Sequence, residues 1–484
     1  MNVRNADVIV VGSGSAGAVV ARRLVDGGAR VLLLEAGGRD DSPAIHDPGR
    51  VHELWHSDVD WAYETVPQAY ANGRRLAWPR GKVLGGSSCL NAMIWVRGAP
   101  EDFDTWAYLG ADGWSWDEVR PVYERLEAEL NPLTAFEPDA IHVALAAAAQ
   151  ECGIPLNGNY NGPSQDGVSF MQYTIQNGVR HSTAAAYIRP VETNERLEIL
   201  TGAAAQRLLF DGTRCVGVEW STGSAHADQI IVCGGTIGSA QLLLLSGIGP
   251  AEHLRTVGID VVADLPGVGE NLHDHLLSPV IFSAEREIGP PAPGLPACQT
   301  HLFWRSRPGL PVPDIQPIHF MVPMYEEWMS GPENGFTLLG GMIRPLSRGT
   351  LRLTGSNAHD PVALDPNILA CEADVESLVA AVELCQRIGA ADALRDWGVT
   401  ERYPASRQVD EYVRQTAITY HHQVGTCKLG TDPLAVVDPR LRVHGIEGLR
   451  VADASVMPMV TTGNTNAPSI MIGERAADFI LADA

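Results

Sequence analysis

Two adjacent histidines near the end of the chain are the residues best suited to proton transfer. His421 and His422 stand in TYHHQVGTCKLG, residues 419–430. An imidazole with an unperturbed pKa of about 6.5 takes up or releases a proton near neutrality, and it is also a common metal ligand. A buried histidine can equally belong to a packed core. This stretch leaves three roles open: catalytic base, metal ligand and core residue.

The metal role finds little support elsewhere in the chain. Adjacent side chains diverge by about 100° on a helix and point to opposite faces of a strand, so two neighbouring rings do not easily reach one ion. His273 and His275 in LHDH have an i, i+2 spacing, but no cysteine or carboxylate cluster recurs at ligand spacing. We therefore predict no metal site. By the same geometry, we expect His421 to face away from His422 in a packing or supporting role.

A strand, a turn, a helix and a second strand open the chain. In ADVIVVGSGSAGAVVARRLVDGGARVLLLEAGG, the apolar run 8–11 predicts a buried strand, 15–25 a helix and 31–34 another strand. This order is a βαβ unit, the repeating element of Rossmann-like folds. The unit must therefore position whatever its turn binds.

Three glycines occupy that turn. Gly12, Gly14 and Gly17 have the G-x-G-x-x-G spacing between strand and helix. They permit a tight turn, close approach of a pyrophosphate and close helix–strand packing, while the helix N-terminus adds positive potential. Glu35 ends the second strand, where an acidic residue binds ribose hydroxyls and disfavours a 2′-phosphate. The pattern predicts a dinucleotide site but does not distinguish FAD from NAD.

A second glycine-rich stretch narrows the choice. In PRGKVLGGSSCLNAMIWVRG, residues 79–98, paired glycines and serines would let a planar ring or a phosphate lie against the backbone. The stretch closely resembles the first signature of the glucose-methanol-choline (GMC) flavoprotein oxidoreductases. Residues 234–249 resemble the second signature, with Ala240 where proline or serine is usual, and 265–275 and 436–458 resemble further family segments. The resemblance runs nearly end to end.

This resemblance implies FAD as the dinucleotide, and it implies a role for several residues. Gly12, Gly14, Ser15 and Gly17 would lie by the pyrophosphate, Glu35 on the adenosine ribose, Val83, Gly86, Asn91 and Ala92 along the flavin, and Asp453 with Ala454 by the ribitol and flavin edge. Some relatives attach FAD through a histidine just before the signature asparagine. Leu90 stands there in this chain, so we predict non-covalent FAD.

The same resemblance divides the histidine pair. HQVGT is similar to the family's H-P-x-G-T, which places the catalytic base at His422, with Gln423 where many relatives have proline. Asn464 in GNTNAP occupies the partner position, where some relatives carry a second histidine. It would donate to the substrate oxygen. Asn464 could also cap the final helix, as its neighbours Thr465 and Asn466 could.

The length and the segment pattern predict an α/β protein, α+β overall, of two domains, because single cores stop growing at roughly 250–300 residues. The family resemblance implies how they divide: a Rossmann-like FAD-binding domain over 1–275 with a C-terminal return at 435–484, and a β-sheet substrate domain over 276–434. The proline- and glycine-rich composition of 284–315 indicates a boundary or a surface loop. Helical periodicity marks 372–390. A closing helix follows from 468.

The formal net charge of −23 disfavours nucleic acid and anionic membranes as partners. The N-terminal apolar run is too short for a signal peptide or a membrane span, so we expect cytoplasmic residence. The oligomeric state is left open. Apolar pocket candidates, each expected in the core rather than in the lining, are Phe303, Trp304, Phe320, Met321, Met324 and Trp328.

The predicted activity is FAD-dependent oxidation of an alcohol to a carbonyl, with hydride to the flavin N(5) and the proton to His422. Oxygen or another acceptor would then take the electrons. Resemblance to the branch with HHQVGT and GNTNAP indicates a primary alcohol, either aryl, furan or small. Three alternatives stay open: a sugar or other secondary alcohol, a nicotinamide-dependent dehydrogenase, and a flavin-binding protein without turnover.

Overall fold

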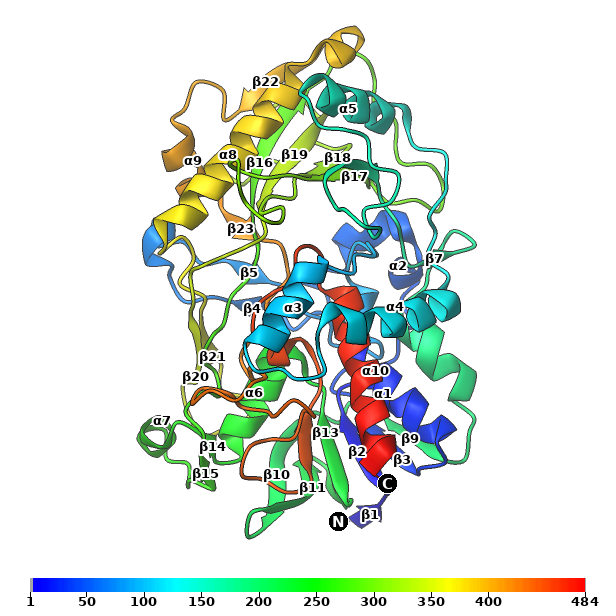
Figure 1. Ribbon diagram of the computed structural model, residues 1–484, viewed down its shortest axis with the longest axis vertical. Helices are drawn as coiled ribbons and strands as arrows, with labels where there is room; N and C mark the ends of the chain where they lie inside the picture. Colours follow the sequence, from blue (N-terminus) through cyan, green and yellow to red (C-terminus); the bar gives the residue numbers. More distant parts are fainter. Residues whose placement is uncertain (1–2, 484) are drawn as a thin grey trace.

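The computed structural model describes residues 3–483, and its two largest sheets lie at opposite ends of the molecule (Figure 1). The lower sheet is parallel and has five strands in the order β24-β13-β2-β3-β9. Its strands are β24 (Leu449–Val451), β13 (Gln229–Val232), β2 (Val8–Val11), β3 (Val31–Leu34) and β9 (Leu197–Leu200). Both predicted strands of the βαβ unit are confirmed as β2 and β3.

The helix of this unit, α1 (Ser15–Asp26), also matches its prediction. It packs against α10 (Asn466–Asp483), the predicted closing helix, which has Pro468 in its first turn. Glycines allow α1 to lie close to the turn that precedes it and close to α10. A Cβ on Gly17 would lie 1.9 Å from the Gly12 carbonyl oxygen, and one on Gly473 would lie 2.6 Å from the Ala16 carbonyl oxygen. The lack of a side chain at Gly473 thus lets α10 pack closely against α1 beside the parallel sheet.

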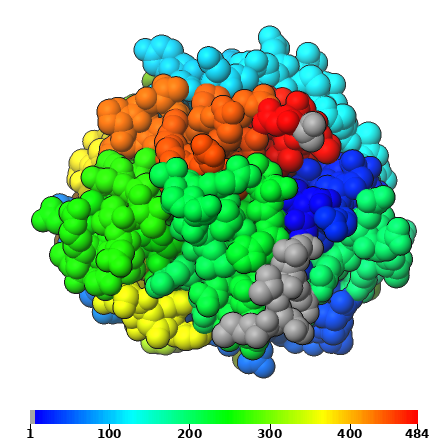
Figure 2. Space-filling model, turned by 90° about the horizontal axis from the view of Figure 1, so that it is seen from below, coloured from blue at the N-terminus to red at the C-terminus, as the bar shows by residue number. Residues whose placement is uncertain are grey.

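Segments far apart in the sequence therefore share one face of the molecule. Seen from below, the orange segment containing β24 and the red end of α10 lie beside green and blue segments (Figure 2). A further sheet in this half has the order β1-β12-β11-β10, with β1 (Val3–Asn5), β12 (Gly223–His226), β11 (Arg214–Trp220) and β10 (Ala205–Asp211). The C-terminal segment thus completes the half that the N-terminal segment begins.

The upper sheet has seven strands in the order β22-β16-β19-β18-β17-β6, with β23 also paired to β16. The pairings among them are antiparallel. The strands are β22 (Thr400–Tyr403), β16 (Leu276–Ser283), β19 (Gly335–Met342), β18 (Ile318–Phe320), β17 (Cys298–Phe303), β6 (Gly167–Phe170) and β23 (Ile418–Thr419). One face packs against α8 (Glu372–Gly389), which confirms the helix predicted at 372–390.

Two strands of this sheet were not anticipated from composition. β17 is fully buried although it lies inside the proline- and glycine-rich stretch 284–315, because the prolines flank CQTHLF rather than interrupt it. β6 comes from the range 1–275 and inserts into the upper sheet beside β17. The α/β class with a Rossmann-like sheet and a second substrate-side sheet is confirmed, and the domain limits remain a prediction.

The remaining α-helices lie around and between the sheets. They are α2 (Pro43–His46), α3 (Pro100–Tyr108), α4 (Trp116–Leu130), α5 (Ala140–Glu151), α6 (Gly235–Leu245), α7 (Ala251–Thr256) and α9 (Val409–Thr416). Short strand pairs are β4 (Tyr63–Glu64) with β5 (Ala77–Trp78), β7 (Ile175–Gln176) with β8 (Val179–Arg180), β14 (Ile248–Gly249) with β15 (Ala263–Asp264), and β20 (Thr350–Leu353) with β21 (Val362–Asp365). Within residues 3–483, no helix is both long and apolar enough to cross a membrane.

Candidate active site

A cavity of about 2010 Å³ is lined by residues of both halves of the molecule. Residues of the glycine turn form one part of its wall, and Leu277, Ile318 and Leu339 of the upper sheet form another. The predicted site residues that line it are Gly12, Gly14, Ser15, Glu35, Gly86, Asn91, Ala92, His422, Asp453, Ala454 and Asn464. Gly17 and Val83 are not in the lining. The structure thus brings residues from both ends of the chain to one cavity.

Backbone packing shapes the floor of this cavity. Gly12 has a left-handed φ of +95°, and a Cβ there would lie 2.4 Å from the Cys233 carbonyl oxygen. A Cβ on Gly86 would lie 2.6 Å from the Cα of Gly14. The glycine turn and the GGSS loop therefore approach each other as bare backbone. A larger residue at Gly86 would force the two loops apart, whereas a Cβ on Gly14 would lie 3.8 Å from the Gly86 Cα, an ordinary contact.

Glu35 is buried at the end of β3, where its carboxylate organises both loops. Its Oε2 accepts hydrogen bonds from the backbone N–H of Ser13 (3.1 Å) and from the Ser13 hydroxyl, and its Oε1 accepts from Gly37 N–H at 2.8 Å. Ser13 Oγ in turn accepts from Gly85 N–H at 3.2 Å. Burial raises the pKa of Glu35, while the Ser13 bonds oppose that rise. Ser13 is a site residue that the sequence motif contains but did not single out.

Arg180 fixes the loop that contains Asn91. Its Nη1 donates to the carbonyl oxygen of Asn91 at 2.6 Å and to Asn91 Oδ1 at 2.8 Å, and its Nε donates to the Ile45 carbonyl at 2.7 Å. Arg180 is 2% exposed, and burial lowers its pKa to about 10. No motif surrounds it, so sequence reasoning missed it. Val83, on the same loop, packs in a small apolar cluster with Ile45 and does not enter the cavity.

Asp453 follows β24 and links three segments. Its Oδ2 accepts from Gly235 N–H (2.9 Å) and from the Ser239 hydroxyl (2.5 Å), and its Oδ1 accepts from Ser455 N–H at 2.8 Å. Burial raises its pKa, and the hydrogen bond from Ser239 is the largest opposing influence. These bonds hold Ala454 at the cavity wall beside the start of α6.

His422 is held on several sides and is 7% exposed. Its Nε2 lies 3.2 Å from Asn464 Nδ2, and its Nδ1 lies 3.0 Å from His275 Nδ1. Its backbone N–H donates to Asp274 Oδ1 at 2.8 Å, and the Tyr420 ring stacks on it with centroids 4.6 Å apart. Burial lowers its pKa well below 6.5, and the neighbouring His275 contributes to that shift. The ring is therefore neutral near pH 7.

A hydrogen bond from Gln316 sets the orientation of the Asn464 side chain. Gln316 Nε2 donates to Asn464 Oδ1 at 3.1 Å, which turns the Asn464 amide NH₂ towards His422. These contacts engage both ends of the Asn464 amide. Asn466, the first residue of α10, accepts a hydrogen bond from the Ser15 hydroxyl at 2.7 Å. No sequence motif pointed to Gln316 as a site residue.

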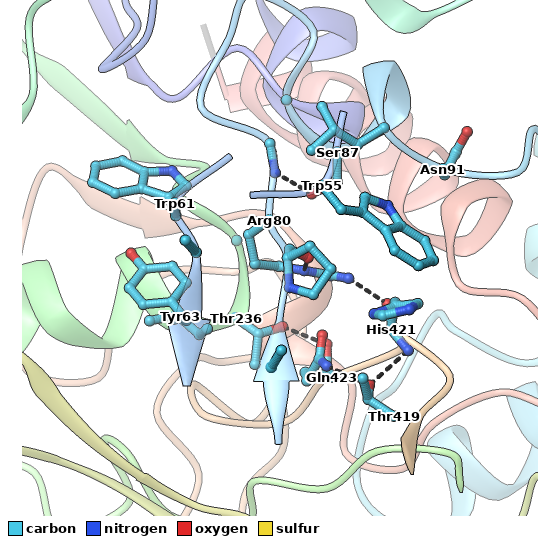
Figure 3. Close-up of a pocket in the computed structure, with 18 of the residues that line it drawn as sticks. Trp55, Trp61, Tyr63, Arg80, Ser87, Asn91, Thr236, Thr419, His421 and Gln423 are labelled. Atoms are coloured by element: carbon cyan, nitrogen blue, oxygen red, sulfur yellow. Dashed lines mark hydrogen bonds between the residues drawn. The ribbon is translucent and has the colours of Figure 1, made fainter. Parts of the chain in front are cut away.

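His421 lines the same cavity as His422. Its φ of +66° is left-handed, so the pair follows neither helix nor strand geometry, and the supporting role of His421 remains a prediction. Its ring lies against Trp55 with centroids 4.9 Å apart. Its carbonyl accepts from Arg80 and its N–H donates to Thr419, both at 2.7 Å (Figure 3).

The apolar candidates divide into two groups. Phe320, Met324 and Trp328 line the cavity. Phe303 and Met321 are buried in the core, and Trp304 is partly buried against it. Aromatic residues of the β4–β5 region, Trp61 and Tyr63, add to the lining and lie near Arg80 (Figure 3).

The donor set fits FAD. Gly12 and Gly14 line the cavity as bare backbone where a pyrophosphate would lie, the N-terminus of α1 adds positive potential, and Glu35 stands where a ribose would lie. In the part of the chain from 3 to 483, no group of three or more His, Cys, Asp or Glu side chains is arranged to hold a metal ion.

Comparisons with known proteins bear on this geometry. Family models described as GMC oxidoreductase match residues 6–277 and 345–473. The chain is 40% identical to mitochondrial choline dehydrogenase of Homo sapiens, covering 98% of this chain and 89% of that one. It is 36% identical to alcohol dehydrogenase (acceptor) of Pseudomonas putida, with coverage of 98% and 95%. The crystal structure of pyridoxine 4-oxidase from Mesorbium loti superposes with a TM-score of 0.92, at 33% identity and 98% coverage of both chains.

Proposed function

This chain belongs to the GMC oxidoreductase family of FAD-dependent enzymes that oxidise CH–OH substrates, and we propose that it converts a primary alcohol to an aldehyde with His422 as the base. Membership in this flavoprotein family sets aside the nicotinamide alternative. The observation that carries the proposal is the pairing of His422 Nε2 with the Asn464 amide at the cavity wall.

His422 has the properties that a base for a hydroxyl proton needs. Burial keeps its ring neutral near pH 7, so its unprotonated nitrogen can take up the hydroxyl proton once the substrate hydroxyl replaces the Asn464 N–H as its partner. The Asn464 NH₂ has two hydrogens, of which one faces His422, so the second can donate to a substrate oxygen as negative charge develops. FAD, when bound, supplies the acceptor for the hydride from the alcohol carbon. Stacked Tyr420 keeps the His422 ring in place while the proton moves to it.

The residues proposed to hold FAD are the glycine turn, Glu35, the GGSS loop with Asn91, and Asp453 with Ala454. We propose that the attachment is non-covalent. Leu90 lines the cavity at the position where some relatives have a linking histidine, and an alkyl side chain cannot form a bond to the flavin.

The lining favours a ring-bearing primary alcohol. Trp55, Phe320 and Trp328 border the cavity and offer flat apolar surface to an aryl or heteroaromatic ring. The similar structure whose name gives pyridoxine as substrate agrees with this choice. A small alcohol would leave much of this surface uncovered.

An alcohol panel tests the proposal. The purified protein is expected to be yellow, and acid precipitation should release its flavin into the supernatant. Mixed anaerobically, benzylic and furan-type primary alcohols should bleach the flavin faster than choline, secondary alcohols or sugars. Reoxidation with oxygen and peroxide detection, in parallel with an artificial electron acceptor, identifies the oxidant.

Three results would contradict parts of this proposal. A colourless protein without extractable flavin would remove FAD, and flavin that stays with the precipitate would remove non-covalent attachment. Bleaching restricted to sugars or secondary alcohols would replace the substrate class.

A further inference from the structure

The upper half of the cavity differs from the cofactor half in the kind of side chain that faces it. Within residues 3–483, the strands of the upper sheet contribute no charged side chain to the cavity lining. Thr419 of β23 is polar, and its hydroxyl donates to Asp274 Oδ2. The other lining residues of these strands, which we call the apolar strip, are Ile418, Leu277, Leu339, Ile318, Phe320 and Cys298.

Strand pairing makes the apolar strip continuous. Its members form three pairs of neighbours on adjacent strands: Ile418 with Leu277, Leu339 with Ile318, and Phe320 with Cys298. Leu277 lies two residues before Pro279, the partner of Leu339, so Leu277 and Leu339 share one face of the sheet. At ~4.8 Å between neighbouring strands, the strip runs roughly 19 Å from β23 across β16, β19 and β18 to β17 (Figure 1).

One end of the apolar strip lies at the catalytic wall. Strand β23 ends at Thr419, and the next residue, Tyr420, stacks on the His422 ring. The other end lies at β17, where the preceding loop adds Pro296 and Ala297 to the cavity lining. Proline has no backbone N–H, so this end is poor in hydrogen-bond donors. The strip therefore leads from the proposed base to a second apolar wall.

The charged residues of the cavity lining lie on other segments. They belong to the cofactor loops, to residues 64–80, to residues 326–327 and to Asp360. Glu326 follows β18 in sequence, but the charge that acts on it most is that of Arg74, which opposes the rise of its pKa on burial. A charged group on the strip would thus be buried without a partner, which is strongly unfavourable.

We infer that the apolar strip binds an uncharged hydrocarbon tail of the substrate, so that the preferred alcohols carry an alkyl tail beyond their ring. A single ring with its CH₂OH group covers only part of the strip. The inference rests on the proposed function, because the hydroxyl must lie at His422 for the tail to extend along the sheet. Since the tail does not touch the reacting atoms, it should raise affinity and leave the rate of hydride transfer unchanged.

A series of alcohols that differ only in the tail tests this inference. The FAD-loaded protein is reduced anaerobically in a stopped-flow instrument by benzyl alcohol and by its 4-methyl, 4-propyl and 4-pentyl derivatives. The concentration dependence gives an apparent Kd and a limiting rate constant for each alcohol. A further probe, 4-[4-(hydroxymethyl)phenyl]butanoate, has a tail of similar length to the pentyl group but ends in a carboxylate.

Ala297→Phe blocks the far end of the apolar strip. Ala297 lines the cavity and is partly buried against the core. Ala144→Phe is the matched control, because Ala144 of α5 is also partly buried against the core but does not line the cavity. Both variants carry the same added ring in the same half of the molecule, so only the effect on the cavity differs.

In the wild type, the apparent Kd should fall by about two- to fourfold for each added CH₂. The limiting rate constant should vary by less than about threefold. The butanoate should bind at least about tenfold more weakly than the 4-pentyl alcohol. Ala297→Phe should remove most of the gain from the pentyl tail and leave the Kd of benzyl alcohol within about twofold. Ala144→Phe should retain the full dependence on tail length.

A wild-type Kd that does not change along the alkyl series would overturn the inference, and so would equal affinity for the butanoate and the 4-pentyl alcohol. Retained tail dependence in Ala297→Phe, or equal loss in Ala144→Phe, would also overturn it. If Ala297→Phe fails to fold, the wild-type series decides. If no alcohol reduces the flavin, the proposed function fails. The strip is then tested with 4-alkylanisoles, whose Kd from the flavin difference spectrum should still fall with tail length; a constant Kd would overturn it.

Discussion

The cofactor part of the cavity and its catalytic wall are built by different means. At Gly12 and Gly86 the decisive feature is the absence of a side chain, which lets Gly12 approach the Cys233 backbone and Gly86 approach Gly14. At the catalytic wall, by contrast, side chains from His275, Gln316, His422 and Asn464 orient one another through directional hydrogen bonds. The first part should control whether FAD is held, and the second should control whether it is reduced.

His422→Ala is expected to have the largest effect: it should slow flavin reduction and leave FAD binding intact. Loss of a general base typically costs about 10²- to 10⁴-fold, so flavin reduction by alcohol should slow by that factor while FAD content stays at the wild-type level. Stopped-flow bleaching and the flavin-to-protein absorbance ratio measure the two quantities in one sample.

The same substitution one residue earlier is the control. His421→Ala removes a ring that lies against Trp55 and should slow reduction by less than about tenfold, because the His422 contacts remain. If His421→Ala causes the larger loss, the base must be assigned to His421 instead.

Gly86→Ala is expected to affect the other property, the binding of FAD. Its Cβ would lie 2.6 Å from Gly14 Cα, so FAD content should fall about tenfold or more, equivalent to about 1.4 kcal/mol of binding energy. Gly212→Ala is the matched control, because Gly212 has a similar positive φ (+60°) but nothing within 4 Å of its Cβ position. Full FAD retention in Gly86→Ala would show that the close approach does not shape the site.

The smallest effect is expected from pH. The protonated His422 cannot accept a proton, and its pKa lies well below 6.5, so activity is lost only as the pH falls through that lowered value. Flavin reduction should change by less than about twofold between about pH 7 and 8.5 and decline in acid. A midpoint at or above 6.5 would contradict the buried, neutral ring.

The cofactor part was the easier one to predict from sequence. Strand β2, helix α1 and strand β3 follow one another directly, and their hydrophobic periods and glycine spacing are local properties. The full-length resemblance supplied the order of segments and the second sheet. Residue roles at the site, including those of His422 and Asn464, remain predictions with a consistent geometry.

What could not be predicted depends on contacts between distant residues. His275 and His422 are 147 residues apart, and Arg180 and Asn91 are 89 apart. No spacing rule links such pairs. The left-handed φ of His421 could not be predicted, because a non-glycine residue seldom prefers such a φ, and here the hydrogen bonds with Arg80 and Thr419 accompany it.

The packing of α10 on α1 also bears on how the protein is made. Ribosomes add about 5–20 residues per second, and the N-terminal parts of a chain emerge and can fold first. Helix α1 emerges well before the edge strand β24 and before α10, which packs against it. Until α10 emerges it cannot cover the small apolar face of α1, and that face is accessible to chaperones.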